Sequence, residues 1–186
     1  MNTQFDIKKL IELGEIQNEL DFERALIADR KLRLLSKESP KFKAQRKKLR
    51  SLIEAYENKN WSPKSKIDNK KLQESDIAEL IAEKERQFIE RRKELIKAKL
   101  IRLDLNQQDF GLILGHRSKS YISELMNGIN SFSLKDLIII NRLLKIDLTD
   151  LVPTFIPHTE QVKIRASIEK LENPKLKLSK DDFVLS

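Results

Sequence analysis

The chain has 186 residues, with 37 Lys and Arg against 29 Asp and Glu, so its formal net charge is +8. It contains no Cys and two His, which excludes a disulfide scaffold, a thiolate metal site and a cysteine nucleophile. Four Gly and five Pro are few for this length, so the composition indicates an all-α fold with long helices and few turns.

The positive charge is unevenly distributed along the chain. Residues 1–104 hold 26 Lys and Arg against 19 Asp and Glu, whereas residues 105–153 hold five of each. Within the first segment, residues 30–50 carry ten basic side chains and one Glu. A basic excess of this kind favours a polyanionic partner. The longest purely apolar run, LIII at 137–140, is too short to cross a membrane, and MNTQFDIKKL lacks the apolar core of a signal peptide. We therefore expect a cytoplasmic protein.

The first third of the chain predicts two or three helices. Apolar residues recur at helical spacing from Leu10 to Leu35 and again from Phe42 to Tyr56. Between these runs, Ser39 can cap a helix and Pro40 suits its first position, so an antiparallel hairpin is expected. The polar stretch NKNWSPKSKIDNKKLQ, residues 58–73, predicts a linker.

A long helix should follow the linker, capped by Ser75 or Asp76 and lined on one side by apolar residues from Ile77 to Leu103. Short helices come next. Asn106 with Asp109, and later Ser133 with Asp136, have the spacing of capping boxes. Gly115 and Gly128 should end the two helices between them. A last turn at 147–151 is closed by Pro153.

Two short helices around LGHRSK predict a helix-turn-helix. Gly111 allows the two helices to approach closely, and Ile122 and Leu125 fix the second helix on the first. The side chains then expected to face outward are Lys119, Ser120, Tyr121, Ser123 and Glu124. Lys can donate to guanine, Ser can bond to any base, and Asn and Gln suit phosphate.

Residues 105–153, which contain ELMNGIN, resemble the helix-turn-helix of the lambda-repressor-like family. The resemblance implies that Gln107 opens the first helix and touches the DNA backbone, and that Lys119 and Ser120 read base edges. It also implies that Asn127 contacts phosphate, although Asn127 equally suits a C-terminal helix cap. The DNA-binding residues predicted in this way are Gln107, Arg117, Ser118, Lys119, Ser120, Tyr121, Ser123, Asn127 and Asn130. The basic segment of the predicted hairpin, residues 30–50 (the basic hairpin), is either a second surface for DNA or RNA, through Lys41, Arg46, Lys47, Lys48 and Arg50, or a solvated helix face.

NELDFERALIADRKLRLL and LIEAYENKNW are similar to the N-terminal region of HigA-like antitoxins from bacterial toxin–antitoxin pairs. This resemblance implies that the protein neutralises a RelE-like or HigB-like mRNA-cleaving toxin and, as a homodimer, represses its own operon at a palindromic operator. Because such toxins are commonly basic, we expect the toxin to contact acidic and apolar surface. The residues concerned are Glu15, Glu19, Asp21, Glu54, Tyr56 and Glu57.

The expected fold is an N-terminal helical region joined by a long helix to a five-helix lambda-repressor-like domain, followed by a tail. The expected divisions are residues 1–73, 74–153 and 154–186. In the tail, KLKLS and DFVLS alternate like short strands. The sequence offers no catalytic constellation, metal site or cofactor motif. The alternative function is a stand-alone transcription regulator whose N-terminal helices oligomerise or sense a ligand.

Overall fold

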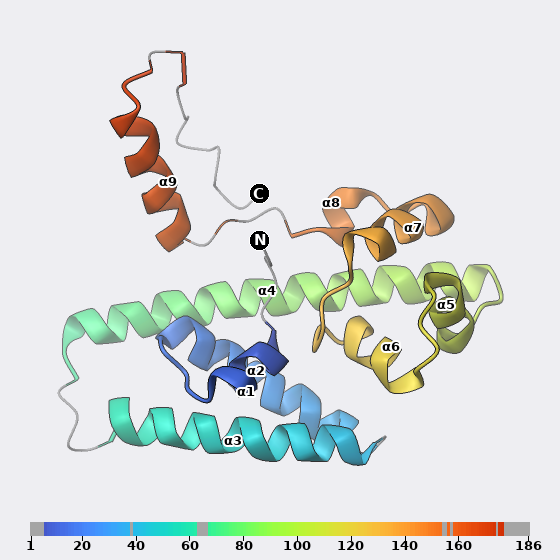
Figure 1. The fold of residues 1–186 in the computed structure, drawn as a ribbon, viewed down its shortest axis with the longest axis horizontal. Helices are drawn as coiled ribbons and strands as arrows, with labels where there is room; N and C mark the ends of the chain where they lie inside the picture. Colours follow the sequence, from blue (N-terminus) through green and yellow to red (C-terminus); the bar gives the residue numbers. More distant parts are fainter. Residues whose placement is uncertain are drawn as a thin grey trace.

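The computed structural model describes residues 6–37, 39–62, 67–153, 156, 158–173 and 175–176, and all the regular structure in these ranges is helical (Figure 1). This confirms the all-α fold predicted from composition. The predicted strands of the tail lie almost entirely outside the described residues. Among the described helices, none combines the length and the hydropathy needed to cross a membrane.

Three helices form a compact N-terminal unit: α1 (Ile7–Leu13), α2 (Glu19–Leu35) and α3 (Pro40–Asn60). Ser39 caps α3 and Pro40 occupies its first turn, as predicted. The helices α2 and α3 form the expected antiparallel hairpin (Figure 1). Their shared core includes Ala25, Leu32, Phe42 and Leu49, all fully buried, and Phe22 stacks on Tyr56 with ring centroids 4.8 Å apart.

The long helix α4 (Asn69–Arg102) runs through both halves of the molecule (Figure 1). Its N-terminal cap is Asp68, whose side chain accepts from the amide of Lys71, so the helix begins earlier than the predicted start at Ser75 or Asp76. The helix α3 likewise continues to Asn60, and the connection between the two helices is therefore shorter than residues 58–73. The predicted boundary at 73/74 falls inside α4.

Four short helices follow α4: α5 (Gln107–Leu114), α6 (Lys119–Met126), α7 (Leu134–Leu144) and α8 (Leu148–Leu151). The helices α5, α7 and α8 pack against α4, and α6 packs against α5. These five helices enclose a second core, which includes Ile96, Phe110, Leu125 and Ile140. Both predicted capping boxes are present. A further helix, α9 (His158–Lys170), occupies the segment that the sequence assigned to a tail.

The guanidinium of Arg92 connects α4 to α8, the last of the five helices around the second core. Arg92 is 3% exposed, donates to the carbonyl of Leu151 at 3.1 Å, and lies over the rings of Phe88 and Phe132. Burial lowers the pKa of Arg92 below its ordinary value. The interior of the bundle therefore holds a hydrogen-bonded cation that ties α4 to α8.

Candidate nucleic-acid interface

A tight turn brings α5 and α6 together. Gly115 ends α5 in the left-handed conformation with φ +84°, a backbone state that glycine adopts without a steric penalty. Ser118 then caps α6 by accepting from the amide of Tyr121. A Cβ on Gly111 would lie 2.6 Å from Cγ1 of Ile122, so only glycine fits where the two helices touch.

His116 and Asp136 hold the turn against α7. The Nε2 atom of His116 lies 3.0 Å from Oδ1 of Asp136, and the His116 ring meets the Tyr121 ring edge-on at 5.0 Å. Asp136 is 1% exposed, and its other oxygen accepts from the amide and hydroxyl of Ser133. The start of α6 is therefore fixed by side chains from both the turn and α7.

The N-terminal ends of α5 and α6 border an open groove. Gln107 and Gln108 line it from α5, and Lys119, Ser120 and Asn127 from α6 and its end. Lys93 and Lys97 line it from α4, and Leu34 and Leu35 from the end of α2. Lys93 and Lys97 were not among the predicted site residues, although their spacing of four places them one turn apart on the same helix face.

Several predicted DNA-binding residues remain accessible. Arg117, Ser118 and Lys119 are exposed, and Gln107, Ser120 and Tyr121 are half-buried. All six lie at the turn or at the starting ends of α5 and α6, so the structure brings them together.

The prediction that Ser123 and Glu124 face outward is wrong, and Asn130, which was predicted to bind DNA, is also buried. Ser123 is 5% exposed, Glu124 is fully buried and Asn130 is 8% exposed. Two lysines of the N-terminal unit, Lys8 and Lys41, pair with Glu124 and cover this side of α6. Asn130 donates to the Glu124 carboxylate. Asn127 forms the C-terminal cap of α6; its Nδ2 donates to the carbonyl of Ser123 at 2.8 Å, and its Oδ1 accepts from Lys93 at 2.8 Å.

The basic hairpin is partly engaged inside the molecule. Lys41 pairs with the buried Glu124, and Arg46 binds both oxygens of Asp29 on α2. Lys47 and Lys48 are exposed, and Arg50 is exposed beside Glu54 at 3.7 Å. Two of the five residues predicted for a second DNA surface therefore have internal ion pairs.

The acidic residues predicted for toxin contact also divide into two groups. Glu19 accepts from the Tyr56 hydroxyl at 2.9 Å and from the Trp61 indole at 3.1 Å, and Tyr56 is 8% exposed. Asp21 accepts from Asn18 and Arg24. Glu19, Asp21 and Tyr56 therefore take part in the packing of the N-terminal unit, whereas Glu15, Glu54 and Glu57 are exposed.

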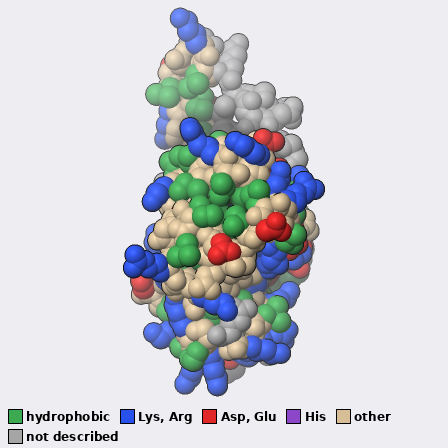
Figure 2. Space-filling model, turned by 90° about the vertical axis from the view of Figure 1, so that its right-hand side faces the viewer, with side chains coloured by type: hydrophobic (Ala, Val, Ile, Leu, Met, Phe, Trp, Pro, Cys, Tyr) green, Lys and Arg blue, Asp and Glu red, His purple; other side chains and the backbone are tan. Residues whose placement is uncertain are grey.

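The end of the molecule where α4 finishes beside α5 presents a mixed surface. Figure 2 shows hydrophobic side chains gathered in the middle of this face, with Lys and Arg around them. Exposed apolar residues of these elements include Ile101, Leu103 and Leu112.

A comparison with family models matches residues 96–151 to the family described as Helix-turn-helix. No curated protein and no solved structure matches the chain. The matched segment begins in the last two turns of α4 and ends with α8, and so coincides with the five helices around the second core. Such a domain is regulatory and binds DNA; it is not a catalytic domain. Residues 96–151 are therefore an XRE-type helix-turn-helix domain, which supports a role of the chain in DNA binding and transcription regulation.

Proposed function

We propose that the protein reads duplex DNA with the starting ends of α5 and α6. The observation that carries the proposal is the groove beside α6, where Lys93, Lys97 and the side-chain amides of Gln107 and Gln108 lie beside Lys119 and Ser120. Ammonium and amide groups are the usual partners of phosphate oxygens. With the DNA backbone bound in this groove, Lys119 and Ser120 face the base edges, where Lys can donate to guanine and Ser can hydrogen-bond to any base.

Replacement of Lys119 tests this assignment. Duplexes selected from a random-sequence pool by the wild-type protein serve as probes, and binding is measured by fluorescence anisotropy. Lys119→Ala should lose the preference for selected over random duplex, because its contact is to bases. The control, Arg142→Ala, removes an exposed charge from the last turn of α7 and should keep that preference. An equal effect of both changes would refute the role of Lys119.

The two exposed lysines of the basic hairpin are proposed as phosphate contacts. Lys47→Ala with Lys48→Ala should weaken binding to all duplexes alike and lower the salt slope of log K by about 2, one for each phosphate contact. A slope equal to that of the wild type removes the hairpin from the DNA interface.

For the wider role, we infer an antitoxin that neutralises an mRNA-cleaving toxin and represses its own operon as a homodimer on a palindromic operator. The resemblance of the N-terminal unit to HigA-like antitoxins supports this inference, as does its position in front of a helix-turn-helix domain. Glu15, Glu54 and Glu57 are the accessible acidic residues for a basic toxin. Ile101, Leu103 and Leu112 offer apolar surface for a second copy.

Co-expression with the product of the adjacent reading frame tests the antitoxin proposal. The wild type should co-purify with a small basic protein and suppress its toxicity. Glu54→Lys with Glu57→Lys should abolish both effects by charge repulsion, whereas Glu74→Lys with Glu79→Lys, at exposed positions of α4, should abolish neither. A neighbour that neither binds nor is neutralised favours the stand-alone regulator instead.

A further inference from the structure

The helix α6 is covered on both of its sides. Successive residues of a helix are turned by about 100°, so Ile122, Leu125 and Met126 share one side, and Ser120, Ser123, Glu124 and Asn127 share the other. The apolar side packs into the second core. The polar side is the one that a helix-turn-helix presents to the major groove, and in this chain it faces α1, α2 and α3.

Glu124 is the centre of this contact. Its carboxylate is fully buried and pairs with Lys8 of α1 at 3.8 Å and with Lys41 of α3. Asn130 donates to the same carboxylate. A buried carboxylate without such partners would be costly, so these contacts are required for the covered state.

The end of α6 is held by α2 and α4. Lys31 of α2 donates to the carbonyl of Asn127 at 3.1 Å and pairs with Glu90 of α4 at 3.2 Å. Burial lowers the pKa of Lys31, an effect that Glu90 opposes. Two residues beyond Asn127, Ile129 is fully buried in the core of the N-terminal unit.

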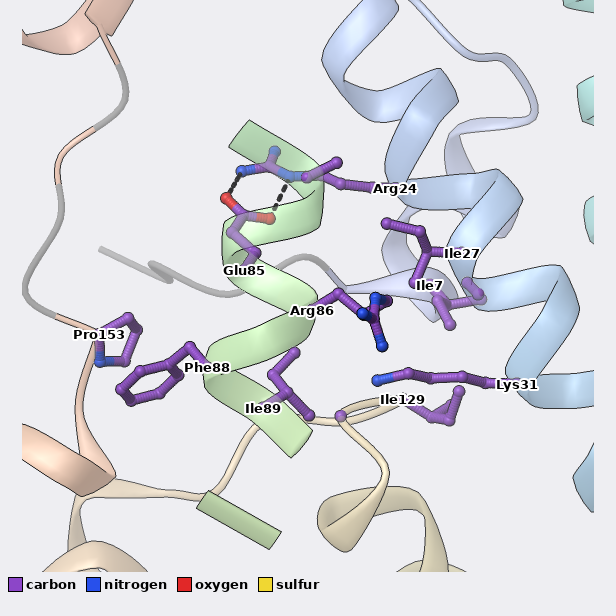
Figure 3. A pocket seen from close by; sticks show the side chains of 13 residues that line it. Ile7, Arg24, Ile27, Lys31, Glu85, Arg86, Phe88, Ile89, Ile129 and Pro153 are labelled. Atoms are coloured by element: carbon purple, nitrogen blue, oxygen red, sulfur yellow. Dashed lines mark hydrogen bonds and ion pairs between the residues drawn. The ribbon is translucent and has the colours of Figure 1, made fainter. Parts of the chain in front are cut away.

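Figure 3 shows the junction from close by. Ile7 and Lys31 of the N-terminal unit and Ile129 of the helix-turn-helix domain lie on the same side of α4. Above them, Arg24 of α2 makes two hydrogen bonds to Glu85 of α4. A partly open cavity of about 50 Å³ lies at this junction and is lined by residues of the N-terminal unit, α4 and the helix-turn-helix domain.

We propose that the N-terminal unit is a built-in inhibitor of DNA binding, which covers the reading side of α6 and must move away before α6 enters the major groove. The groove is about 12 Å wide and admits one helix, so α6 cannot enter with α1 and α3 against it. In the covered state only the starting end of α6, at Arg117, Ser118 and Lys119, reaches DNA. This inference rests on the proposed DNA-binding function and adds its regulation.

Removing the lysines that pair with Glu124 should raise the affinity for DNA, whereas simple electrostatics predicts a lower affinity. Lys8→Ala with Lys41→Ala removes two positive charges, which by itself weakens binding to DNA. It also removes both cationic partners of Glu124, which favours the uncovered state. The apparent affinity rises in proportion to the uncovered fraction, and we expect roughly tenfold tighter binding than in the control. The control is Lys9→Ala with Lys43→Ala. These two lysines are exposed and lie on α1 and α3, so their replacement removes the same charge from the same helices.

Both double variants of the full chain are titrated with a random-sequence duplex, and hydrogen exchange of the α6 amides is followed in parallel. Tighter binding and faster exchange of α6 in the Lys8/Lys41 variant support the proposal. Equal or weaker binding overturns it, whether or not α6 exchanges faster, and leaves the proposed DNA-binding function intact. If no form of the protein, the wild type included, binds any duplex, both proposals fail. Should the double variant lose helical content, Lys41→Met against Lys43→Met gives the same comparison with the apolar stems retained.

Discussion

Replacing Gly111 by alanine should push α5 and α6 apart. The added Cβ would lie 2.6 Å from Cγ1 and 3.1 Å from Cδ1 of Ile122, and 3.0 Å from the carbonyl oxygen of His116. Carbon atoms in contact are normally about 3.5–4.0 Å apart. Because Ile122 is 1% exposed and the third atom belongs to the backbone, neither neighbour can give way without moving α6 by about 1 Å.

The expected magnitude is the difference of two effects. Overpacking of a filled core costs about 1–3 kcal/mol, and the rigid neighbours place this site at the upper end. The higher helix propensity of alanine stabilises the folded state by about 1 kcal/mol and offsets part of this loss. We therefore expect Gly111→Ala to lower the free energy of unfolding by about 2 kcal/mol, measured by urea denaturation followed by circular dichroism.

Two further variants show whether the collision is the cause. Gly115→Ala places its Cβ where no atom lies within 4 Å, so it should cost only the strain of φ +84°, about 1–2 kcal/mol. In the Gly111→Ala background, Ile122→Ala should cost at least about 1 kcal/mol less than in the wild type, because it removes the colliding atoms. Additive losses, or a Gly111→Ala protein as stable as the wild type, would refute this account of the close approach.

Two other contacts give predictions of stability. Arg24→Ala should lower the free energy of unfolding by about 2–3 kcal/mol, because it leaves the nearly buried Glu85 without the guanidinium that donates two hydrogen bonds to it. Arg50→Ala breaks an exposed ion pair and should change the free energy of unfolding by less than about 1 kcal/mol. Equal losses of the two variants in urea denaturation would contradict this ranking. Asp136→Ala should cost about 2 kcal/mol, because it removes one half of the capping box of α7 and the partner of His116. The loss should exceed that of Asp109→Ala, which removes only the corresponding half of the capping box of α5. A smaller loss at Asp136 than at Asp109 would show that His116 adds nothing.

Local patterns in the sequence predicted much of the fold. The two capping boxes and the Ser39–Pro40 start depend on residues within one helical turn of each other, and all three are present. The start of α4 was misplaced because Asp68 and Ser75 are both chemically able to cap a helix. The choice between them depends on where the chain leaves α3.

The candidate site was predicted less completely because its main feature is a long-range contact. The helical spacing of Ser123 and Glu124 correctly places them opposite the apolar side of α6. Nothing near them in the sequence indicates that Lys8 and Lys41, more than eighty residues away, cover that side. The basic charge of residues 30–50 was noticed, but its use inside the molecule by Lys41 and Arg46 depends on partners that only folding brings close.

The covering of α6 has a consequence for the order in which the protein is made. The N-terminal unit ends at Asn60 and emerges from the ribosome before α6 has been synthesised, because α6 begins only at Lys119. At about 5–20 residues per second, the lysines that pair with Glu124 precede it by several seconds. The surface that covers the reading side of α6 is thus already present when that helix emerges. A newly made molecule can fold directly into the covered state, with no interval in which α6 is free to bind DNA.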